Sequence, residues 1–567
     1  MDIYNYYKGI FLDCINSYNL SDELKFKIIV EKPKQNIFGD ISLNAPLVLS
    51  SYLKKSPMDI ASEISDLIKD KTHDFSKVEI AKPGFINFTI KQQVLISFLE
   101  NIKKDFGFPE NLKKQKINLE FVSANPTGPL HVGHCRGAIF GDVLSNLLNY
   151  CGHEVTKEYY INDYGNQITF FVESIYFRIL EILKKEKFPD NANLYPGEYI
   201  KDIAKEILDQ KIINNFDNFL SIKEKLTEQS ISVAMKLIKQ NLKDMGIEHD
   251  FYVSEKKIVK ENLLDQAIEK LETKGDIFKG ILPKPKGDAE DWEPREQLLF
   301  KSTKYGDDVD RALQKSDKTW TYFANDIAYH FNKIDRDFDL YINVLGADHA
   351  GYVKRLKSAF SAIDNNKKFE IKLSQIVKLY KGGQPFRMSK RAGDFILAKD
   401  LIDTVGKDSV RFMMVYRSSN SQLDFDFDAV TEKSKDNPVF YVQYACARIN
   451  SIFNKIKNIN DNEIQNANKS YLTDKHEINL IKKILEWPKI VLLCHSNLEV
   501  HYIPYYLYEL AQEFHSYWNA GKEDNSLRII DNPNEDILKA RLFLLKKIFT
   551  IFSNGMRILD VKVPDKM

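Results

Sequence analysis

Hydrophobic and polar positions switch repeatedly between a period of two and a helical period along the middle of the chain. Residues 117–121 (INLEF) alternate apolar with polar side chains, which predicts a strand. Prolines and a glycine follow, and a helical pattern then runs over about 132–151. Further strands are predicted at 154–163, 340–351 and 374–396. Strands that alternate with helices in this way indicate an α/β domain built on a parallel sheet.

Changes in this pattern divide the chain into three parts. Residues 1–108 are predicted to form a small α/β domain, in which a Pro-Gly pair at 83–84 marks a turn or bulge within a strand-like stretch. Residues 109–430 carry the strand–helix alternation, together with a charged and largely helical insertion at about 180–300. Residues 431–567 show long amphipathic helical patterns. A length of 567 residues agrees with several domains, because a single core rarely grows that large.

Composition and charge narrow the class of protein. Hydrophobic residues make up 43% and charged residues 28% of the chain, as in ordinary globular proteins. The net charge of +1 gives no global positive field, so a nucleic-acid partner would have to meet a local basic face. No apolar run reaches the roughly 18 residues of a membrane span, and the five cysteines are scattered without a CxxC pair. We therefore expect a cytoplasmic protein without a membrane segment.

Two histidines at the start of the predicted helix are the first candidates for chemistry. His131 and His134 lie three residues apart, so they share one face of the first turn, directly after a strand. A helix N-terminus at the carboxyl end of a parallel strand binds phosphate through its N–H groups, and Gly133 leaves room for a nucleotide near the backbone. A metal site with Cys135 is an alternative, but it lacks further ligands at suitable spacing. Two capping or surface histidines are the other alternative.

A basic loop later in the α/β domain is the second candidate. The stretch 386–393 (FRMSKRAG) places Lys390 between Arg387 and Arg391, and a Gly-Gly pair precedes it at 382–383. Mobile cations on a glycine-rich loop suit a polyphosphate leaving group, which gains negative charge as it departs. Taken alone, the loop could equally be a solvated basic turn. The GxxxxGK[ST] pattern is absent from the sequence, which argues against P-loop chemistry.

Several ordered blocks of the sequence resemble one family. HVGH and the later RMSKR resemble the paired nucleotide-binding signatures of class I aminoacyl-tRNA synthetases. The wider blocks EFVSANPTGPLHVGHCRGAIFGD, YINDYGNQ, YFANDIAYH, VLGADHAGYVKRL and NPVFYVQYACARI are similar to arginyl-tRNA synthetases. GDISLNAP and AKPGFIN extend the resemblance into the N-terminal part, so that it covers nearly the whole chain.

This resemblance implies a fold and an activity. The fold would be α/β: a Rossmann-like parallel-sheet catalytic domain with a helical insertion, a small N-terminal α/β domain that contacts tRNA, and an all-α anticodon-binding bundle. The activity would be that of an arginine–tRNA ligase, which activates L-arginine with ATP and esterifies the terminal adenosine of tRNA(Arg). Mg²⁺ is implied by the ATP chemistry without a dedicated protein site, and we expect a monomer.

The resemblance also implies which residues bind ATP. His131, Gly133, His134, Met388 and Lys390 would hold it, and the two histidines and Lys390 would act on the transition state. Many relatives instead carry a lysine just before the histidine motif. This chain has Gly128 there, so we expect the phosphate-binding cation to be the loop lysine.

Arginine selection would depend on a separate set of residues. Tyr322 and Asp326 are spaced i and i+4, hence on one helical face. A carboxylate there can accept two parallel hydrogen bonds from a guanidinium, which the ammonium group of lysine cannot donate in that geometry. By resemblance the arginine-binding residues are Glu120, Ser123, Asn125, Tyr322, Asp326 and His349, and the tRNA-binding residues of the C-terminal bundle are Tyr441, Gln443, Tyr444 and Arg448.

Two other classes of function remain as alternatives. One is a non-catalytic tRNA-binding paralogue. The argument against it is the joint retention of five candidate residues: His131, His134, Lys390, Asp326 and Glu120. The other is a nucleotidyltransferase of the same fold that acts on a small acid without RNA. The helical C-terminal part and the N-terminal domain argue against that class, because a small-molecule enzyme has no use for them.

Overall fold

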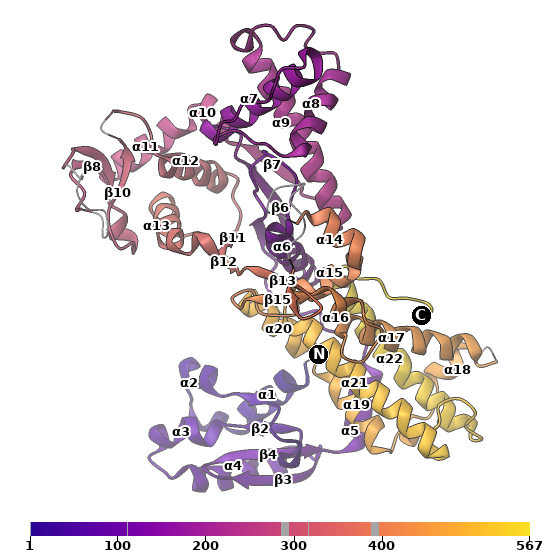
Figure 1. Ribbon diagram of the computed structural model, residues 1–567. Helices are drawn as coiled ribbons and strands as arrows, with labels where there is room; N and C mark the ends of the chain where they lie inside the picture. The colour runs from indigo at the N-terminus through magenta and orange to yellow at the C-terminus, as the bar shows by residue number, and fades with distance from the viewer. Residues whose placement is uncertain (1, 110–111, 285–293, 316, 387–395, 457) are drawn as a thin grey trace. The chain divides into compact units, whose positions relative to one another are not determined.

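The computed structural model of the chain forms two compact units (Figure 1). The central unit contains residues 113–432, and the terminal unit contains residues 1–112 together with residues 433–567. The structure describes residues 2–109, 112–284, 294–315, 317–386, 396–456 and 458–567.

The central unit is built on five strands: β5 (Lys116–Glu120), β6 (Glu154–Ile161), β7 (Phe251–Ser254), β11 (Leu340–Gly346) and β12 (Lys368–Ser374). Their order in the sheet is β12-β11-β5-β6-β7, and every neighbouring pair is parallel, which confirms the predicted α/β class. The order runs outward in opposite directions from β5 and β11, and helix α6 (Val132–Tyr150) connects β5 to β6. Open α/β sheets bind ligands at such a change of direction.

Two polar side chains of β5 lie inside the protein. Alternating strands commonly expose their polar residues, but Asn118 is 0% and Glu120 is 5% exposed. The reason is that both faces of the parallel sheet are covered. A buried polar group needs a partner: the Asn118 amide donates to Glu158 Oε2 (2.6 Å), and Glu120 Oε2 pairs with the ammonium group of Lys333 (2.7 Å).

This buried network fastens helix α12 (Tyr322–Asp335) to the sheet. Lys333 lies in the helix, and the Tyr329 hydroxyl of the same helix lies 2.8 Å from Glu120 Oε2. Arg336, directly after the helix, donates two hydrogen bonds to the carboxylate of Glu158 (2.6 and 3.0 Å). Burial alone would raise the pKa of Glu158, but Lys333 and Arg336 lower it to about 2. The position of α12 therefore depends on paired charges.

The segment between β6 and β7 is helical. Helices α7 (Asn166–Lys184), α8 (Glu198–Asp209) and α9 (Phe219–Asp244) pack through an apolar core. The expected insertion at about 180–300 is interrupted by β7, which belongs to the main sheet. The part after β7 is therefore not a continuation of the helical segment. That part holds α10 (Glu255–Lys260), α11 (Leu263–Thr273) and the antiparallel strands β8 (Ile277–Gly280), β9 (Gln297–Phe300) and β10 (Arg311–Gln314).

The residues after β12 do not continue the parallel sheet, contrary to the prediction for 374–396. Strand β13 (Val377–Lys381) pairs instead with β14 (Gln384–Pro385) and β15 (Leu423–Asp426) in a separate three-stranded sheet. The buried Arg136 of α6 donates to the carbonyl groups of Gln375 (3.1 Å) and Ser421 (2.6 Å), which ties this region to α6. The remaining helices of the unit are α13 (Val353–Ile363), α14 (Ala398–Val405), α15 (Lys407–Met414) and α16 (Phe427–Thr431).

The N-terminal part of the terminal unit is a small α/β domain. Its strands are β1 (Val30–Glu31), β2 (Ile41–Leu43), β3 (Phe75–Ala81) and β4 (Phe85–Ile90), in the antiparallel order β1-β2-β4-β3. The stretch that contains the Pro-Gly pair is a hairpin of β3 and β4 with that pair in its turn. The helices are α1 (Ile3–Cys14), α2 (Asp22–Lys27), α3 (Ala45–Leu53), α4 (Pro57–Lys71) and α5 (Gln92–Glu100).

The C-terminal part of the terminal unit is a helical bundle, as predicted. Its apolar faces meet in a core that includes Leu480, Phe514 and Phe552, all 0% exposed. Pro488 lies in the first turn of α20, where a missing N–H costs no helical hydrogen bond. The helices are α17 (Pro438–Lys455), α18 (Asp461–Gln465), α19 (Lys475–Leu485), α20 (Trp487–Asn497), α21 (Tyr502–Glu523) and α22 (Glu535–Leu559).

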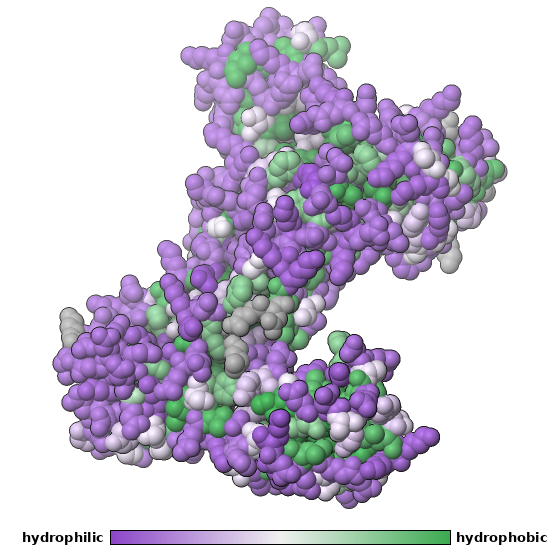
Figure 2. All heavy atoms as spheres, turned by 180° about the vertical axis from the view of Figure 1, so that it is seen from behind, coloured by the Kyte–Doolittle hydropathy of each residue, from purple (hydrophilic) through white to green (hydrophobic). Residues whose placement is uncertain are grey.

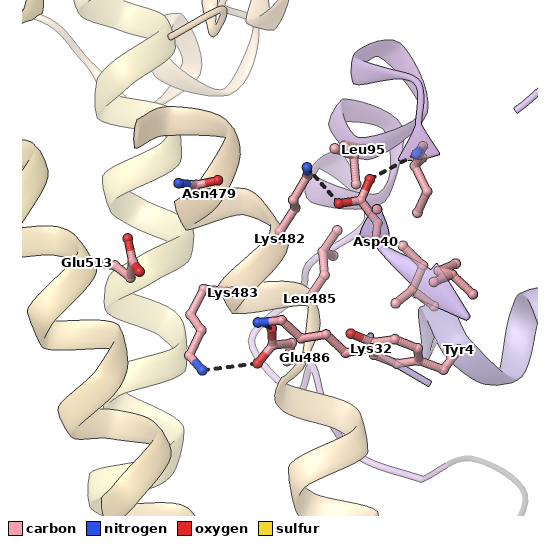
Figure 3. Close-up of a pocket in the computed structure, with 14 residues that line it drawn as sticks. Tyr4, Lys32, Asp40, Leu95, Asn479, Lys482, Lys483, Leu485, Glu486 and Glu513 are labelled. Carbon is pink, nitrogen blue, oxygen red and sulfur yellow. Dashed lines mark hydrogen bonds and ion pairs between the residues drawn. The ribbon is translucent and has the colours of Figure 1, made fainter. Parts of the chain in front are cut away.

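A small pocket lies between the N-terminal domain and α19 within the terminal unit (Figure 3). Two ion pairs cross it: Lys482 with Asp40 (2.6 Å) and Lys32 with Glu486 (2.7 Å). Lys483 also pairs with Glu486 (3.0 Å). Because carboxylates already neutralise these lysines, we do not expect the pocket to bind an anionic ligand. Its ion pairs instead join parts of the chain that are far apart in sequence.

The surface of the molecule is largely polar. On the face seen in Figure 2, hydrophilic residues cover most of the surface, and hydrophobic residues form smaller patches. Large apolar side chains such as Phe121, Tyr341 and Trp487 are instead fully buried. Within the described ranges, no helix combines the length and the apolar character that crossing a membrane requires.

Replacing Lys333 with Met should destabilise the central unit by roughly 3–5 kcal/mol, because Glu120 would become an unpaired buried charge. Denaturant unfolding measures the change. The matched control is Lys357→Met, whose ion pair with Glu370 (3.2 Å) is exposed to solvent and should contribute less than about 1 kcal/mol. Equal stabilities of the two variants would contradict a structural role for the buried network.

Candidate active site

A cleft lies at the carboxyl ends of the parallel strands, where the strand order changes direction. Its volume is about 690 Å³, and its walls are the segments that follow β5, β11 and β12 and the first turn of α6. This is the edge of the sheet at which the topology predicts a ligand site. The predicted site residues that line it are Ser123, Asn125, His131, Gly133, His134 and His349.

Strand β5 ends in a strained turn at the cleft. The Ser123 N–H donates to the Phe121 carbonyl (3.1 Å) around Val122, whose φ of +72° makes this a γ-turn of the rare, strained type. Ser123 itself has a φ of +42°. The Ser123 hydroxyl donates to Glu120 Oε1 (3.0 Å) and accepts from the Tyr160 N–H (3.1 Å). These bonds hold a backbone conformation that residues other than glycine avoid, at the point where the chain enters the cleft.

The histidine pair caps helix α6. His131 is the N-cap residue, and its Nδ1 accepts from the Gly133 N–H (3.1 Å). His134 Nδ1 accepts from the His131 N–H (3.3 Å), and the two ring centroids are 3.9 Å apart. Because both Nδ1 atoms accept, each neutral ring carries its proton on Nε2. The N–H donor of each neutral ring is therefore at Nε2, away from the atoms used in the cap.

Burial keeps these histidines neutral. It lowers the pKa of His131, and it lowers the pKa of His134 to about 4, with a further contribution from His131 as a like charge. Near pH 7 the helix N-terminus thus presents two neutral N–H donors in addition to its own partial positive charge. This arrangement suits the oxygens of a phosphate group.

Gly133 has a structural role in this cap. A Cβ atom at this position would lie 2.8 Å from Cε1 and 2.9 Å from Nδ1 of His131, too close for the ring to stay in place. The sequence suggested only that the glycine lets a nucleotide approach. Gly133 is exposed and lines the cleft, so both reasons apply to the same residue.

Helix α12 carries the predicted pair Tyr322 and Asp326. Tyr322 occupies the first helical position and is 74% exposed, while Asp326 lies one turn further in and is half-buried. The Tyr352 hydroxyl donates to Asp326 Oδ2. Burial, with a contribution from Glu120, raises the pKa of Asp326 to about 7, although Tyr352 and Arg355 act in the opposite direction. The carboxyl group therefore titrates in the physiological range.

A second carboxyl group, Glu255 at the start of α10, lies close to Asp326. It is 5% exposed, and its Oε1 accepts from the Asn325 amide (3.1 Å). Burial, Asp326 and Asp163 raise the pKa of Glu255 to about 7. The pKa of Tyr160, which faces the same carboxyl groups, is raised by burial and by their charge. An excess of buried carboxylates over cations favours a cationic ligand at this place.

The alternative of a metal site at the histidine pair gains no support. Among the residues that the structure describes, no group of three or more His, Cys, Asp and Glu side chains is arranged to hold a metal ion. Both histidine Nδ1 atoms are used in the helix cap. Cys135 is fully buried, and its Sγ lies 3.7 Å from the His131 carbonyl oxygen.

Comparison with known proteins agrees with this geometry. Three family models match the chain: "Arginyl tRNA synthetase N terminal domain" over residues 6–90, "tRNA synthetases class I (R), catalytic domain" over 98–454, and "DALR anticodon binding domain" over 442–567. A curated arginine–tRNA ligase from Pelagibacter ubique (strain HTCC1062) is 51% identical over the whole of both chains. The chain belongs to the arginyl-tRNA synthetase family. A second relative, the arginine–tRNA ligase of Ehrlichia ruminantium (strain Welgevonden), is 45% identical over 95% of this chain and 94% of its own.

Solved structures of arginyl-tRNA synthetases share the fold. The structure titled as a putative arginyl-tRNA synthetase from Campylobacter jejuni aligns with a TM-score of 0.74 and 30% identity, over 84% of this chain and 100% of that chain. The Thermus thermophilus arginyl-tRNA synthetase aligns over 100% of both chains with a TM-score of 0.76 and 19% identity. The family and the fold class predicted from the sequence are therefore confirmed.

The candidate tRNA-binding residues of this arginyl-tRNA synthetase family member lie on α17 in the terminal unit. Tyr441, Tyr444 and Arg448 are half-buried and gather against α21. The Arg448 guanidinium carbon lies 4.4 Å from the centroid of the Tyr444 ring and 5.0 Å from that of the Trp518 ring, and an Arg448 nitrogen lies 3.0 Å from His515 Nδ1. The cluster thus combines partly exposed aromatic faces with one cation, which is a combination that unpaired bases stack on.

Gln443 differs from its three neighbours. Its amide donates to the Lys562 carbonyl (3.2 Å), so this contact ties α17 to the C-terminal residues. Trp518 and His515 were not predicted, because spacing within one helix gives no information about which residues of another helix lie against it.

Other predicted residues have different surroundings. Asn125 is exposed, and its amide donates to Gln167 Oε1 (2.7 Å). His349 is exposed beside Asp348, with 3.5 Å between Nε2 and Oδ2. Met388 and Lys390 lie outside the described residues.

Glu255 and Tyr352 lie beside Asp326, and we refer to these three side chains as the carboxylate pocket. Neither Glu255 nor Tyr352 was predicted from the sequence. Tyr352 stands inside the block VLGADHAGYVKRL, so the resemblance marked its surroundings without assigning it a role. Glu255 follows a four-residue strand and belongs to no recognisable motif. Only the approach of α10 to α12 in space reveals it.

Replacing Asp326 with Asn should make the stability of the protein less dependent on pH. The folded pKa of about 7 lies above the ordinary value of 3.8, so the stabilisation from the protonated form is present at low pH and is lost as the pH rises through about 7. The amide never ionises, so the stability of the variant relative to wild type should increase by roughly 2–4 kcal/mol as the pH rises from about 4 to about 7. Thermal unfolding across this range is the measurement. Asp335→Asn, at an exposed position of the same helix, should show no such trend.

Proposed function

We propose that the central unit activates L-arginine with ATP and transfers it to the terminal adenosine of tRNA(Arg). The observation that carries this proposal is a combination: neutral N–H donors lie at the helix N-terminus after β5, and buried carboxyl groups on α10 and α12 lie near Glu120 at the end of that strand. Ser123 connects the two, because it lines the cleft and bonds to the main chain of Tyr160, whose ring lies near the pocket carboxylates. Membership in the arginyl-tRNA synthetase family supports the same reaction.

The carboxylate pocket would select the guanidinium of arginine. Asp326 and Glu255 would accept its N–H groups, and Tyr322 would form the rim of the pocket. Both carboxyl groups have a pKa of about 7, and a bound guanidinium would lower it by supplying the opposite charge. The planar guanidinium can contact two carboxylates at once, whereas the ammonium of lysine is a single point of charge.

The polar groups at the end of β5 would orient the other end of arginine. Ser123, Asn125 and His349 line the cleft within reach of an α-amino or α-carboxylate group. Glu120 already accepts hydrogen bonds from Ser123, and it pairs with Lys333. We therefore infer that Glu120 contributes to arginine binding indirectly, because it fixes the position of the Ser123 hydroxyl.

In the first step an oxygen of the arginine carboxylate attacks the α-phosphorus of ATP, and the bond from this phosphorus to the pyrophosphate oxygen breaks. No enzyme nucleophile is required, so the protein acts by positioning and by stabilising charge. His131 and His134 would donate their Nε2–H groups to phosphate oxygens as these gain charge, beside the exposed Gly133. Met388 would pack near the base, and Lys390 would meet the β- and γ-phosphates. Mg²⁺ would arrive on the ATP phosphates, which are its usual ligands alongside water.

In the second step a hydroxyl group of the terminal adenosine attacks the carbonyl carbon of the adenylate, and AMP leaves as the ester forms. The tRNA would also be held by Tyr441, Gln443, Tyr444 and Arg448 of the terminal unit, where aromatic rings offer stacking surfaces. We further expect the enzyme to act as a cytoplasmic monomer.

Replacing Asp326 with Ala should raise the KM for arginine on the order of 10²-fold, because the guanidinium would lose one of its counter-charges at a cost of about 3 kcal/mol. Binding of ATP should change little. The measurement is tRNA charging with varied arginine, together with ATP binding. The control is Asp335→Ala, which removes an exposed carboxylate from the far end of the same helix. Near-normal arginine affinity in Asp326→Ala would show that the pocket is assigned wrongly.

Replacing Lys390 with Ala should slow adenylate formation by about 10²–10³-fold and barely change the dissociation constant for ATP, because the cation acts mainly on the departing pyrophosphate. Single-turnover adenylate formation in the presence of tRNA is the measurement. An unimpaired variant would remove the loop from the mechanism.

A lysine at position 128 offers a test of compensation for the lost Lys390. Gly128 does not have a positive φ, so its backbone can carry a side chain, but a Cβ there would lie 2.9 Å from Cε2 of the Tyr199 ring. Gly128→Lys should therefore rescue Lys390→Ala only when Tyr199→Ala is also present. Absence of rescue in the triple variant would refute the idea that a cation upstream of the histidines can replace the loop lysine.

A further inference from the structure

Tyr352 is bonded to the carboxylate that the proposed function assigns to arginine. It ends the short 3-10 helix η4 (Ala347–Tyr352), which follows β11, and its hydroxyl donates to Asp326 Oδ2 on α12. The ring packs edge-on against Phe323, with 6.3 Å between centroids, and the guanidinium carbon of Arg355 lies 4.7 Å from the ring centroid. The hydroxyl is therefore held in place by contacts to its ring.

The surroundings of Asp326 favour its protonated form. Glu120 faces it from β5, Glu255 from α10 and the Tyr160 hydroxyl from β6. Arg355 on α13 is a cation that acts in the opposite direction. The Tyr352 hydroxyl also acts in that direction, because a hydrogen bond donated to the charged form stabilises it.

The same kind of bond occurs elsewhere in the central unit, away from the cleft. The Tyr305 hydroxyl donates to Asp276 Oδ2 (2.7 Å). Asp276 also pairs with Lys304 (2.6 Å), so its carboxylate is already neutralised. There the tyrosine donates to a carboxylate that already has a counter-charge. At Asp326 the carboxylate must keep its negative charge available for a ligand, and this difference gives the bond to Tyr352 a second role.

We propose that Tyr352 is a positioning residue for arginine recognition, which orients the Asp326 carboxylate and keeps it ionised for the substrate guanidinium. This inference rests on the proposed function, because it needs Asp326 to bind arginine. The bond from Tyr352 occupies one lone pair of Oδ2 and fixes the plane of the carboxylate. Oδ1 and the second lone pair of Oδ2 remain for guanidinium N–H groups. A protonated carboxyl group would present a donor to those N–H groups instead of an acceptor.

Arg355 supports this arrangement from the other side of the ring. It stacks on Tyr352 and lies 5.8 Å from the centroid of the Phe323 ring, so its guanidinium stays beside the pocket. Its positive charge favours the ionised form of Asp326. Tyr352 and Arg355 therefore act together on the charge and the orientation of one carboxylate, and neither needs to touch the reacting phosphorus.

Replacing Tyr352 with Phe should move the acidic limb of the pH profile of kcat/KM for arginine to higher pH by about one unit, because a hydrogen bond to a charged group is lost. The KM for arginine should rise about tenfold near pH 6.5 and about threefold or less near pH 9, while kcat at saturating arginine should stay close to wild type. The assay is charging of tRNA with varied arginine across this pH range.

Tyr305→Phe is the matched control, since it removes a tyrosine–aspartate bond outside the cleft. It should leave the pH profile unchanged. If the limb of Tyr352→Phe is unshifted, the inference is overturned, even where KM rises equally at every pH, because a uniform rise is what a packing defect produces. Wild-type arginine affinity in Asp326→Ala rejects the proposed function, whereas lost affinity there with an unshifted Tyr352→Phe limb rejects this inference alone.

A second variant keeps the test decisive if Tyr352→Phe does not fold. Arg355→Met retains the tyrosine hydroxyl but removes the cation that stacks on the ring. Its acidic limb should move in the same direction, because the ionised form of Asp326 loses a favourable charge. An unshifted limb in this variant overturns the inference as well.

Discussion

The buried ion pair between Lys333 and Glu120 connects the two halves of the candidate active site. Glu120 ends the strand that leads to the histidine cap, and Lys333 belongs to the helix that carries Asp326. Glu120 also accepts from the Ser123 hydroxyl, so the same carboxylate stabilises the strained turn at the cleft. An apolar pair of similar size could be as stable, but it would not fix the helix and the turn in one register. This buried charge therefore determines geometry more than it adds stability.

Burial affects the protonation of the side chains in opposite directions at the two ends of the candidate site. At the histidine cap, burial removes positive charge from His131 and His134 and leaves directed N–H donors. In the pocket, burial and mutual repulsion raise the pKa of both Asp326 and Glu255 to about 7. In each half, a ligand of complementary charge would therefore be stabilised by groups that are already in place. Such preorganisation places the cost of assembling the site on folding and not on binding.

The sequence alone predicts the features that depend on local pattern. The strand at 117–121, the helix that starts beside His131 and the shared face of Tyr322 and Asp326 all follow from periodicity within one segment. It does not predict that Glu120 is buried, because this depends on what covers both faces of the sheet. Nor does it reveal Glu255 as a neighbour of Asp326, since packing between distant helices decides that contact. The separate sheet around β13 was missed for the same reason: a strand pattern contains no information about its partner.

If Asp326 binds arginine as proposed, the arrangement of α12 would give this recognition its precision. Asp326 and Lys333 are separated by two helical turns, or about 10 Å of rise, so the recognition carboxylate and the anchoring ammonium belong to one rigid rod. Lys333 is 0% exposed, while Asp326, which lies nearer the N-terminal end of the helix, is half-buried. A shift of the anchor would be transmitted along the helix to the carboxylate, and misplacement of about 1 Å is enough to weaken a directed hydrogen bond. Under the proposed function, specificity for a planar cation would depend on the packing of a helix on a sheet, and the hydroxyl of Tyr352 would set the final orientation of one carboxylate.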